Sequence, residues 1–290
     1  MAKMVTINLF DVDWSKQTSQ ALSDTLEEFA AMQLSDRWRG DIRLEQVVKV
    51  AGNPATKMPD RYHLDFSKER AVGPGKLGRL APISGIKMGQ DESFGEETAA
   101  VYVPSKKWLL ILNNQFGIGP TRMAEYFNAV DSIGAGREFF YSVSPQLDAS
   151  ILARLKGMSN LTSIQVTATI DALNAAQNPV GVSLARATQS TSAQKISFTL
   201  AANASRKKSN FLSMVNIKNM VTTLRSQAAG VSVLKLKGED PTTGKKDQVI
   251  DLLEHKMKRQ YRADELKVVN HRYTPQSRWE LLDRALRGWL

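Results

Sequence analysis

The stretch Ala99-Ala-Val-Tyr-Val-Pro-Ser-Lys-Lys-Trp-Leu-Leu-Ile-Leu112 decides the fold class of this chain. Two runs of aliphatic, β-branched and aromatic residues, 99–103 and 108–112, flank the polar segment Pro104-Ser105-Lys106. Two such runs joined by a short turn predict a β-hairpin. The chain is therefore expected to contain antiparallel sheet.

The rest of the chain mixes strand and helix patterns around this hairpin. Alternating apolar residues predict strands at 5–13, 42–50, 61–66, 138–143, 161–170, 195–201, 231–237 and 248–252. Helical spacing predicts helices at 15–32, 122–130, 146–155, 209–227 and 277–289, and a short helix after 252 with Leu253, Met257 and Tyr261 on one face. Since no regular βαβ rhythm connects them, the expected class is α+β, with mixed, largely antiparallel sheets, flanking helices and two lobes. We place an N-terminal globular lobe at 1–144 and a basic C-terminal lobe with a helical tail at 145–290.

Composition narrows the class of protein. The chain has 290 residues, of which 42% are hydrophobic and 23% are charged, as in ordinary globular proteins. No apolar run approaches the roughly 18 residues that a membrane span needs, and the first ten residues do not form a signal peptide. The absence of cysteine excludes disulfides, cysteine zinc sites and a thiol nucleophile. We expect a cytoplasmic protein without a metal or other cofactor and without direct membrane insertion.

The charge is concentrated at the C-terminal end. Residues 201–290 hold 18 Lys and Arg against 9 Asp and Glu, whereas the first 200 residues hold 21 against 20. A basic surface of this kind attracts polyanions, because neutralised phosphates release condensed counterions. Nucleic acid is the leading partner, an acidic membrane face is second, and a solvated charged surface is the plain alternative.

The candidate contacts are basic residues that cluster along the last third of the chain. A basic triplet precedes a predicted helix whose first N–H groups can also hold a phosphate. No helix-turn-helix, zinc-finger or aromatic ribonucleoprotein signature is present, which favours backbone contacts with little sequence choice. The candidates for DNA binding are Arg206, Lys207, Lys208, Lys218, Arg225, Lys235, Lys237, Lys245, Lys246, Lys256, Lys258, Arg259 and Arg262.

Two other functions remain open from the residues alone. Asp240, Glu254 and Lys256 loosely fit the Asp…Glu-x-Lys pattern of metal-dependent nucleases, which need two carboxylates on Mg²⁺ and a lysine beside the attacking water. The pattern is common by chance, and a turn acid with solvated helix charges explains it as well. The third function is a protein–protein adaptor whose basic face meets an acidic partner.

One part of the chain resembles a known family. The segment Trp108–Asn114 is followed by Phe116-Gly-Ile-Gly-Pro-Thr121, the predicted helix Arg122–Val130 and the strand Phe139–Val143. This order resembles phage-exclusion and prophage-borne proteins of the RexA type and, more distantly, the DNA-binding component of the Kiwa antiphage system. The Phe-Gly-x-x-Pro-Thr phrase is the most specific similarity, and the clear part covers about 60 residues.

The resemblance implies a dimer that binds duplex DNA without sequence choice, similar in outline to recombination-associated RdgC proteins. It also implies a role in phage defence, often beside a membrane effector protein to which this chain would signal. No individual DNA contact is carried over from the family, so the candidate contacts rest on charge clustering.

The tail supports the expectation of a homodimer only weakly. Trp279, Leu282, Ala285, Leu286 and Trp289 recur at three- and four-residue spacing and predict an apolar stripe on the last helix. Tryptophans near a terminus are expected to be docked on something. Docking on the core of the same chain is slightly favoured over a subunit contact.

Overall fold

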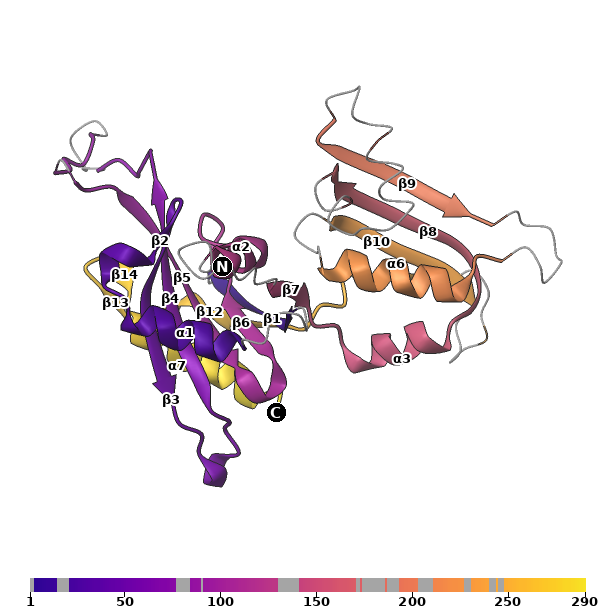
Figure 1. Cartoon of the computed structure of the whole chain (residues 1–290), viewed down its shortest axis with the longest axis horizontal. Helices are drawn as coiled ribbons and strands as arrows, with labels where there is room; N and C mark the ends of the chain where they lie inside the picture. The colour runs from indigo at the N-terminus through magenta and orange to yellow at the C-terminus, as the bar shows by residue number, and fades with distance from the viewer. Residues whose placement is uncertain are drawn as a thin grey trace. The chain divides into compact units, whose positions relative to one another are not determined.

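The structure is a computed structural model. It describes residues 3–14, 21–76, 84–89, 91–129, 141–170, 173, 186, 193–202, 211–226, 231–239, 244 and 248–290, without the side chains of 152, 214, 218, 222, 223, 225 and 226. The chain forms two compact units (Figure 1). Unit 1 consists of Met1–Ile7, Trp14–Tyr141 and Gln260–Leu290, and unit 2 consists of Asn8–Asp13 and Ser142–Arg259. The fold class is α+β with antiparallel sheets, which confirms the class that the sequence predicts.

Unit 1 is built on a long sheet whose middle strands follow one another as hairpins. The strands are β1 (Met4–Trp14), β2 (Trp38–Arg39), β3 (Ile42–Val50), β4 (Arg61–Arg70), β5 (Phe94–Val103), β6 (Trp108–Leu112) and β12 (Lys258–Arg262). Their order is β12-β1-β6-β5-β4-β3-β2, and β7 (Tyr141–Pro145) pairs with β1. The sheet is not confined to unit 1, since residues 8–13 of β1, 142–145 of β7 and 258–259 of β12 belong to unit 2. The predicted hairpin at 99–112 is β5 and β6, paired antiparallel with Val103 opposite Trp108.

One face of this sheet carries the aromatic core of unit 1. Helices α1 (Leu22–Ala31) and α2 (Pro120–Asn128) pack against it. Phe29 of α1 stacks on Tyr126 of α2 at 5.0 Å between ring centroids, and Phe66 of β4 meets Tyr126 edge-on at 5.6 Å. Pro120 stands at the first position of α2, where its missing N–H is not needed.

Gly117 explains the Phe-Gly phrase before α2. A Cβ at this position would collide with the Oγ1 atom of Thr98. That hydroxyl oxygen accepts a 2.9 Å hydrogen bond from the backbone N–H of Ile118. Only glycine lets the loop approach β5 closely enough for this bond.

The opposite face is covered by the last helix, α7 (Pro275–Arg287). Trp279 is 5% exposed and donates a 3.0 Å hydrogen bond from Nε1 to the carbonyl oxygen of Leu64. Its ring stacks on that of His63 at 5.2 Å. The tail therefore belongs to unit 1, and this differs from the predicted C-terminal lobe at 145–290. Short elements precede it: the 3-10 turn Ala263–Glu265 and the hairpin β13 (Val268–Val269) and β14 (Arg272–Tyr273).

Unit 2 has a smaller sheet with helices on one face. The strands β8 (Ser159–Thr169), β9 (Lys195–Ala201), β10 (Val231–Glu239) and β11 (Gln248–Asp251) lie in the order β11-β10-β8-β9, all antiparallel. Helices α3 (Ala149–Gly157) and α6 (Met214–Ser226) pack on the face that carries Leu234, Leu236 and Ile164. Among the described helices of the chain, none is both long enough and apolar enough to cross a bilayer.

The short helix predicted after residue 252 is wrong. Residues 252–255 form turns, and residues 258–262 form strand β12, which pairs with β1. The four-residue spacing of Leu253, Met257 and Tyr261 suggested a helix. Met257 instead donates its backbone N–H to Gln146 at 2.8 Å and accepts from Leu9 at 3.0 Å. Pairing with distant strands overrides the local pattern.

Candidate functional site

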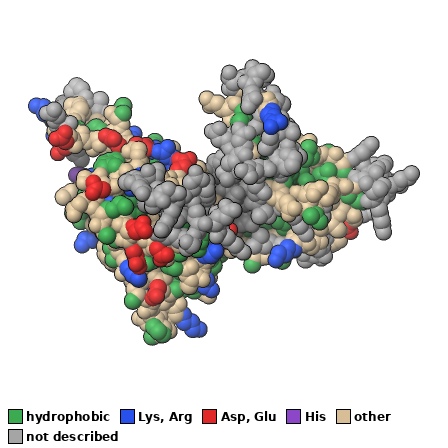
Figure 2. Space-filling model, viewed as in Figure 1, with side chains coloured by type: hydrophobic (Ala, Val, Ile, Leu, Met, Phe, Trp, Pro, Cys, Tyr) green, Lys and Arg blue, Asp and Glu red, His purple; other side chains and the backbone are tan. Residues whose placement is uncertain are grey.

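The excess of basic charge lies in unit 2. Unit 2 holds 16 basic and 9 acidic side chains, an excess of +7, whereas unit 1 holds 23 and 20. In the view of Figure 2, the visible acidic side chains gather over unit 1. Unit 2 is therefore the part of the chain that attracts a polyanion most strongly.

The face of the unit 2 sheet that points away from the core is polar, and we call it the polar face. Side chains of a strand alternate between the two faces of the sheet. The residues next to Leu234 and Ile164 in sequence therefore point away from the core. One row across the sheet consists of Asp251, Lys235, Gln165 and Thr199, in register on four strands. The described residues of the polar face are Ser163, Gln165, Thr167, Thr169, Lys195, Ser197, Thr199, Ala201, Val233, Lys235, Lys237, Glu239, Val249 and Asp251.

Three lysines stand on the polar face, on two strands. Lys235 and Lys237 are two residues apart on β10, roughly 7 Å along the strand. Lys235 forms an ion pair of 3.2 Å with Asp251. Lys195 is exposed at the start of β9, opposite Thr169. Hydroxyl groups lie between them, and those of Thr167 and Ser197 are 2.9 Å apart.

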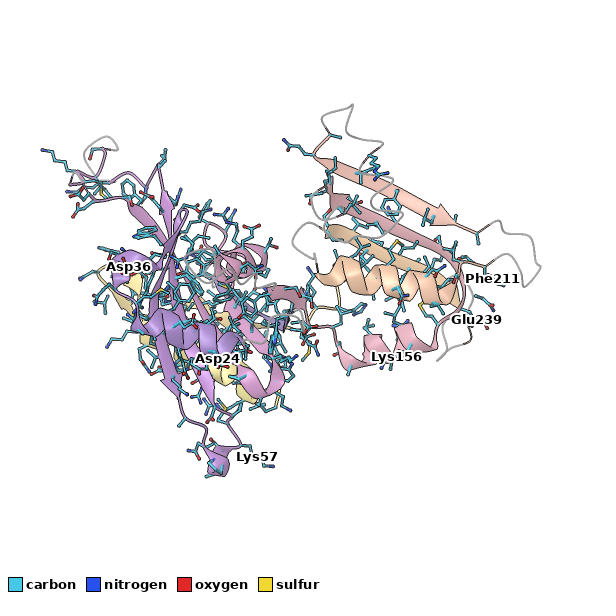
Figure 3. The ribbon with its side chains drawn as sticks, viewed as in Figure 1. Asp24, Asp36, Lys57, Lys156, Phe211 and Glu239 are labelled. Carbon is cyan, nitrogen blue, oxygen red and sulfur yellow. The ribbon has the colours of Figure 1, made fainter. Side chains whose placement is uncertain are left out.

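The acidic residues of the polar face lie at its margins. Asp251 is on the edge strand β11, and Glu239 ends β10, where it accepts a 2.7 Å hydrogen bond from Asn160 (Figure 3). The middle of the described face thus offers ammonium, amide and hydroxyl groups. These are the groups that contact phosphate and sugar in complexes with DNA.

The other predicted contacts are scattered. Lys256 is half-buried, and this burial lowers the pKa of its ammonium group against the attraction of Asp251. Lys258 is exposed and Arg259 is half-buried on β12. Arg262 falls in unit 1 and donates to Asp264 at 3.1 Å. These four basic residues therefore do not form one row, as they would on the helix predicted after residue 252.

The remaining predicted contacts fall outside what the structure describes. Lys218 and Arg225 lie in α6, but their side chains are not described. The residues outside the described ranges are Arg206, Lys207, Lys208, Lys245 and Lys246.

The nuclease hypothesis gains nothing from the described residues. Asp240 lies outside them, Glu254 is exposed in a turn, and Lys256 is half-buried. No group of three or more His, Asp or Glu side chains suited to a metal ion occurs among the described residues. The pattern in the sequence remains its only support.

Of the polar face, the candidate contacts from the sequence include only Lys235 and Lys237, and Lys195 and Gln165 are among the residues missed. The signal for Lys195 was present, because Ile196, Phe198 and Leu200 alternate inward and therefore place Lys195, Ser197 and Thr199 outward. Gln165 could be assigned to the same face only from the register of β8 with β10.

A second group of charged residues lies in unit 1, and its central pair is buried. The side chains of Arg278 and Asp65 are each 4% exposed, with 3.0 Å between Nη2 and Oδ2. The same Nη2 atom lies 3.4 Å from Oε1 of Glu97, which also binds Arg272. Burial raises the pKa of Asp65 to about 7, against the attraction of Arg278. Beside this group, Arg61 donates to both carboxylate oxygens of Asp283 at 2.7 and 2.8 Å.

These features define an α+β protein of two units, with a basic second unit that presents a polar sheet face. Residues 6–275, nearly the whole chain, match a family described as a family of unknown function, DUF6731. The chain belongs to this family. No curated protein matches the sequence.

Proposed function

We propose that the chain binds double-stranded DNA without sequence preference through the polar face of unit 2. The observation that supports this most is the gathering of three lysines with hydroxyl and amide side chains on one sheet face, where Lys195 is exposed and Lys235 and Lys237 are half-buried. These groups bind phosphate and sugar oxygens, which carry no sequence information. The excess of +7 in unit 2 supplies the long-range attraction.

The composition of the face favours a duplex over a single strand. Proteins that bind single strands stack the bases on aromatic side chains. Within the described strands of unit 2, the polar face carries no aromatic residue, since Phe198 points to the core. A duplex keeps its bases stacked internally and needs only backbone contacts. The proposed ligand is therefore duplex DNA, and the proposed role is to bind it.

We predict that replacing Lys195, Lys235 and Lys237 together by glutamine weakens duplex binding strongly. If each lysine neutralises one phosphate, the slope of log K against log[salt] becomes shallower by about 2.7. The corresponding loss of affinity is about 10- to 50-fold at low salt. Fluorescence anisotropy with a random-sequence duplex, across a salt series and with and without Mg²⁺, measures both quantities.

The matched control replaces Lys76, Lys87 and Lys267, three exposed lysines of unit 1, by glutamine. It removes the same charge and should leave the slope unchanged. An equal loss in both variants would reduce the proposal to a net-charge effect. Absence of binding by the unmodified chain at low salt would refute it, and Mg²⁺-dependent cleavage of the duplex would favour the nuclease.

We also propose a role in phage exclusion, as a cytoplasmic homodimer that signals to a membrane effector protein. The support is the resemblance to RexA-type proteins in the phrase Phe116–Thr121 and the elements around it. We expect that expression of the chain lowers the plating efficiency of a sensitive phage and that the triple lysine variant does not. Equal protection by both proteins would separate the role from DNA binding, and a monomer in light scattering would contradict the homodimer.

A further inference from the structure

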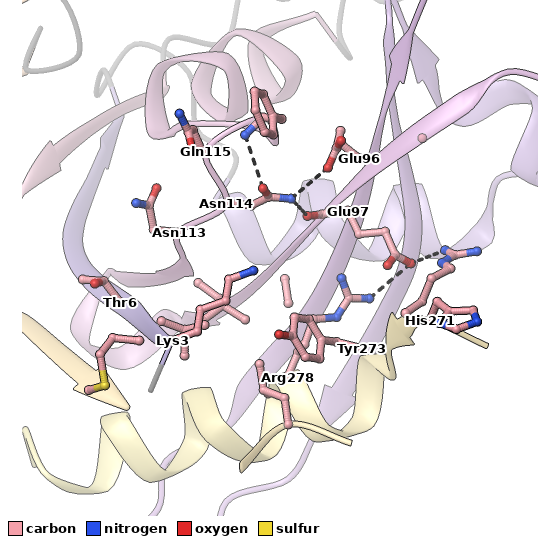
Figure 4. A pocket seen from close by; sticks show the side chains of 18 residues that line it. Lys3, Thr6, Glu96, Glu97, Asn113, Asn114, Gln115, His271, Tyr273 and Arg278 are labelled. Atoms are coloured by element: carbon pink, nitrogen blue, oxygen red, sulfur yellow. Dashed lines mark hydrogen bonds and ion pairs between the residues drawn. The ribbon is translucent and has the colours of Figure 1, made fainter. Parts of the chain in front are cut away.

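Unit 1 contains a pocket of about 590 Å³ that the proposed function does not use. It is lined by the start of β1, the start of β5, the loop after β6, the β14 strand and α7 (Figure 4). A second hollow of about 380 Å³ shares Glu97, Arg272 and Tyr273 with it. Pockets for small ligands generally have about 300–1,000 Å³, so the larger one can accommodate a ligand by itself.

The floor of the pocket is built from the buried ion pairs. Glu97 binds Arg278 and Arg272 at once, and Figure 4 shows dashed lines at its carboxylate. The Nε atom of Arg278 is buried without a hydrogen-bond partner, as is Oδ1 of Asp65 beneath it. Buried polar atoms without partners are rare in folded proteins, and each requires an explanation such as a bound molecule.

The rim offers hydrogen-bond donors that no other described group uses. Lys3, Asn113, Gln115, Tyr273 and His271 line the pocket, and their side chains have no hydrogen bond or ion pair with the described part of the chain. Figure 4 shows Lys3 extending into the space between Asn113 and Tyr273. Such convergent polar groups around a cavity are typical of a ligand site.

The charge balance of the pocket favours an anion. Lys3, Arg272 and Arg278 line it together with Glu96 and Glu97, and Glu96 is itself neutralised by Arg70. Even with Asp65 counted as ionised, these residues carry one more positive than negative charge. The first turn of α7, which borders the second hollow at Thr274 and Pro275, adds the positive end of a helix dipole.

The walls between the polar groups are apolar and partly aromatic. Leu112 and Leu266 are buried in the wall, and Tyr273 and Phe116 contribute rings. A flat ring fits against such walls, while the Asn113 and Gln115 amides can donate and accept at its edge. Phosphate and a ring on one small molecule would satisfy both parts of the pocket.

We propose that this pocket binds a nucleoside monophosphate, with its phosphate on Lys3 and Arg272 and its ring between the apolar walls. The site is separate from the polar face of unit 2, and its ligand is a small molecule. Binding therefore needs no nucleic acid, and the two proposals stand or fall independently.

Isothermal titration calorimetry of the full chain with AMP, GMP, CMP and UMP tests the proposal. At least one should bind saturably and at least tenfold more tightly than the corresponding nucleoside and than inorganic phosphate. Loss of one charge-assisted hydrogen bond in Lys3→Gln should weaken that binding about tenfold. Lys267→Gln, at an exposed lysine of unit 1 outside the pocket, should bind as the unmodified chain does.

Failure of all four nucleotides to bind would overturn the proposal. Equal binding of inorganic phosphate and the nucleotide would also overturn it, because the ring would then contribute nothing. The same conclusion follows if Lys3→Gln and Lys267→Gln bind equally well. Unchanged circular dichroism of Lys3→Gln ensures that its weaker binding reports on the pocket.

Discussion

Replacing Arg278 by alanine is expected to destabilise unit 1 by about 3–5 kcal/mol at pH 8, because it removes the buried partner of Asp65 together with the packing of the arginine side chain. Arg278 lies 3.0 Å from Asp65 and 3.4 Å from Glu97, and nothing else described binds the buried carboxylate of Asp65. Glu97 keeps Arg272, so the loss falls mainly on Asp65. Urea denaturation followed by circular dichroism measures the free energy of unfolding.

The loss should depend on pH in a defined direction. The pKa of Asp65 is raised to about 7 in the folded chain from its ordinary 3.8. The folded chain therefore keeps the carboxyl proton of Asp65 up to a higher pH than the unfolded chain does. The stability that this protonated carboxyl group contributes is fully present below about pH 4 and is lost as pH rises through 7. Without Arg278 the pKa rises further, so the variant should lose about 1 kcal/mol more at pH 8 than at pH 5.

Arg287→Ala is the matched control, since Arg287 is exposed in the last turn of the same helix. Its effect should stay within about 0.5 kcal/mol. Adding Asp65→Asn to Arg278→Ala should recover part of the stability, because the unpaired charge is then gone. A loss in Arg278→Ala no greater than that in Arg287→Ala would contradict the buried ion pair.

The strands were predictable because alternation is a local property. In β9, Ile196, Phe198 and Leu200 point to the core, and the intervening Ser197 and Thr199 follow on the other face. The same rule identifies β5 and β6 around the turn at Pro104. It failed at β12, because the pairing of residues 258–262 with β1 joins segments about 250 residues apart.

The candidate site was predictable only in part, for the same reason. Basic residues are visible in a sequence, but the row Lys235–Gln165–Thr199 exists only through the register of three strands. The buried group of unit 1 gave no local signal. Alternation in β4 places Asp65 on the polar face of the strand, and only the docking of α7 brings Arg278 over it.

Replacing Trp279 by alanine is expected to destabilise unit 1 by about 3–5 kcal/mol, through the cavity it leaves under α7. Trp279 is 5% exposed, stacks on His63, and donates to the carbonyl oxygen of Leu64 at 3.0 Å. The variant loses the burial of the ring, its stacking on His63 and its hydrogen bond. The carbonyl group of Leu64 stays in the sheet without the indole donor. Urea denaturation again gives the free energy, and Trp279→Phe should lose less because the ring contact survives.

Trp289→Ala is the control within the same tail, because Trp289 is half-buried beyond the end of α7. Less of its surface leaves water on folding, so its removal should cost less than half as much. Equal losses for Trp279→Ala and Trp289→Ala would contradict the docking of α7 on β4.

This docking also determines which experiment can test for a homodimer. Truncation after Pro275 would expose the face that carries His63 and Asp65, so a loss of dimer in that truncated chain would report unfolding of unit 1. Light scattering of the full chain, compared with that of Trp289→Ala, separates a subunit contact of the tail from its role in the core.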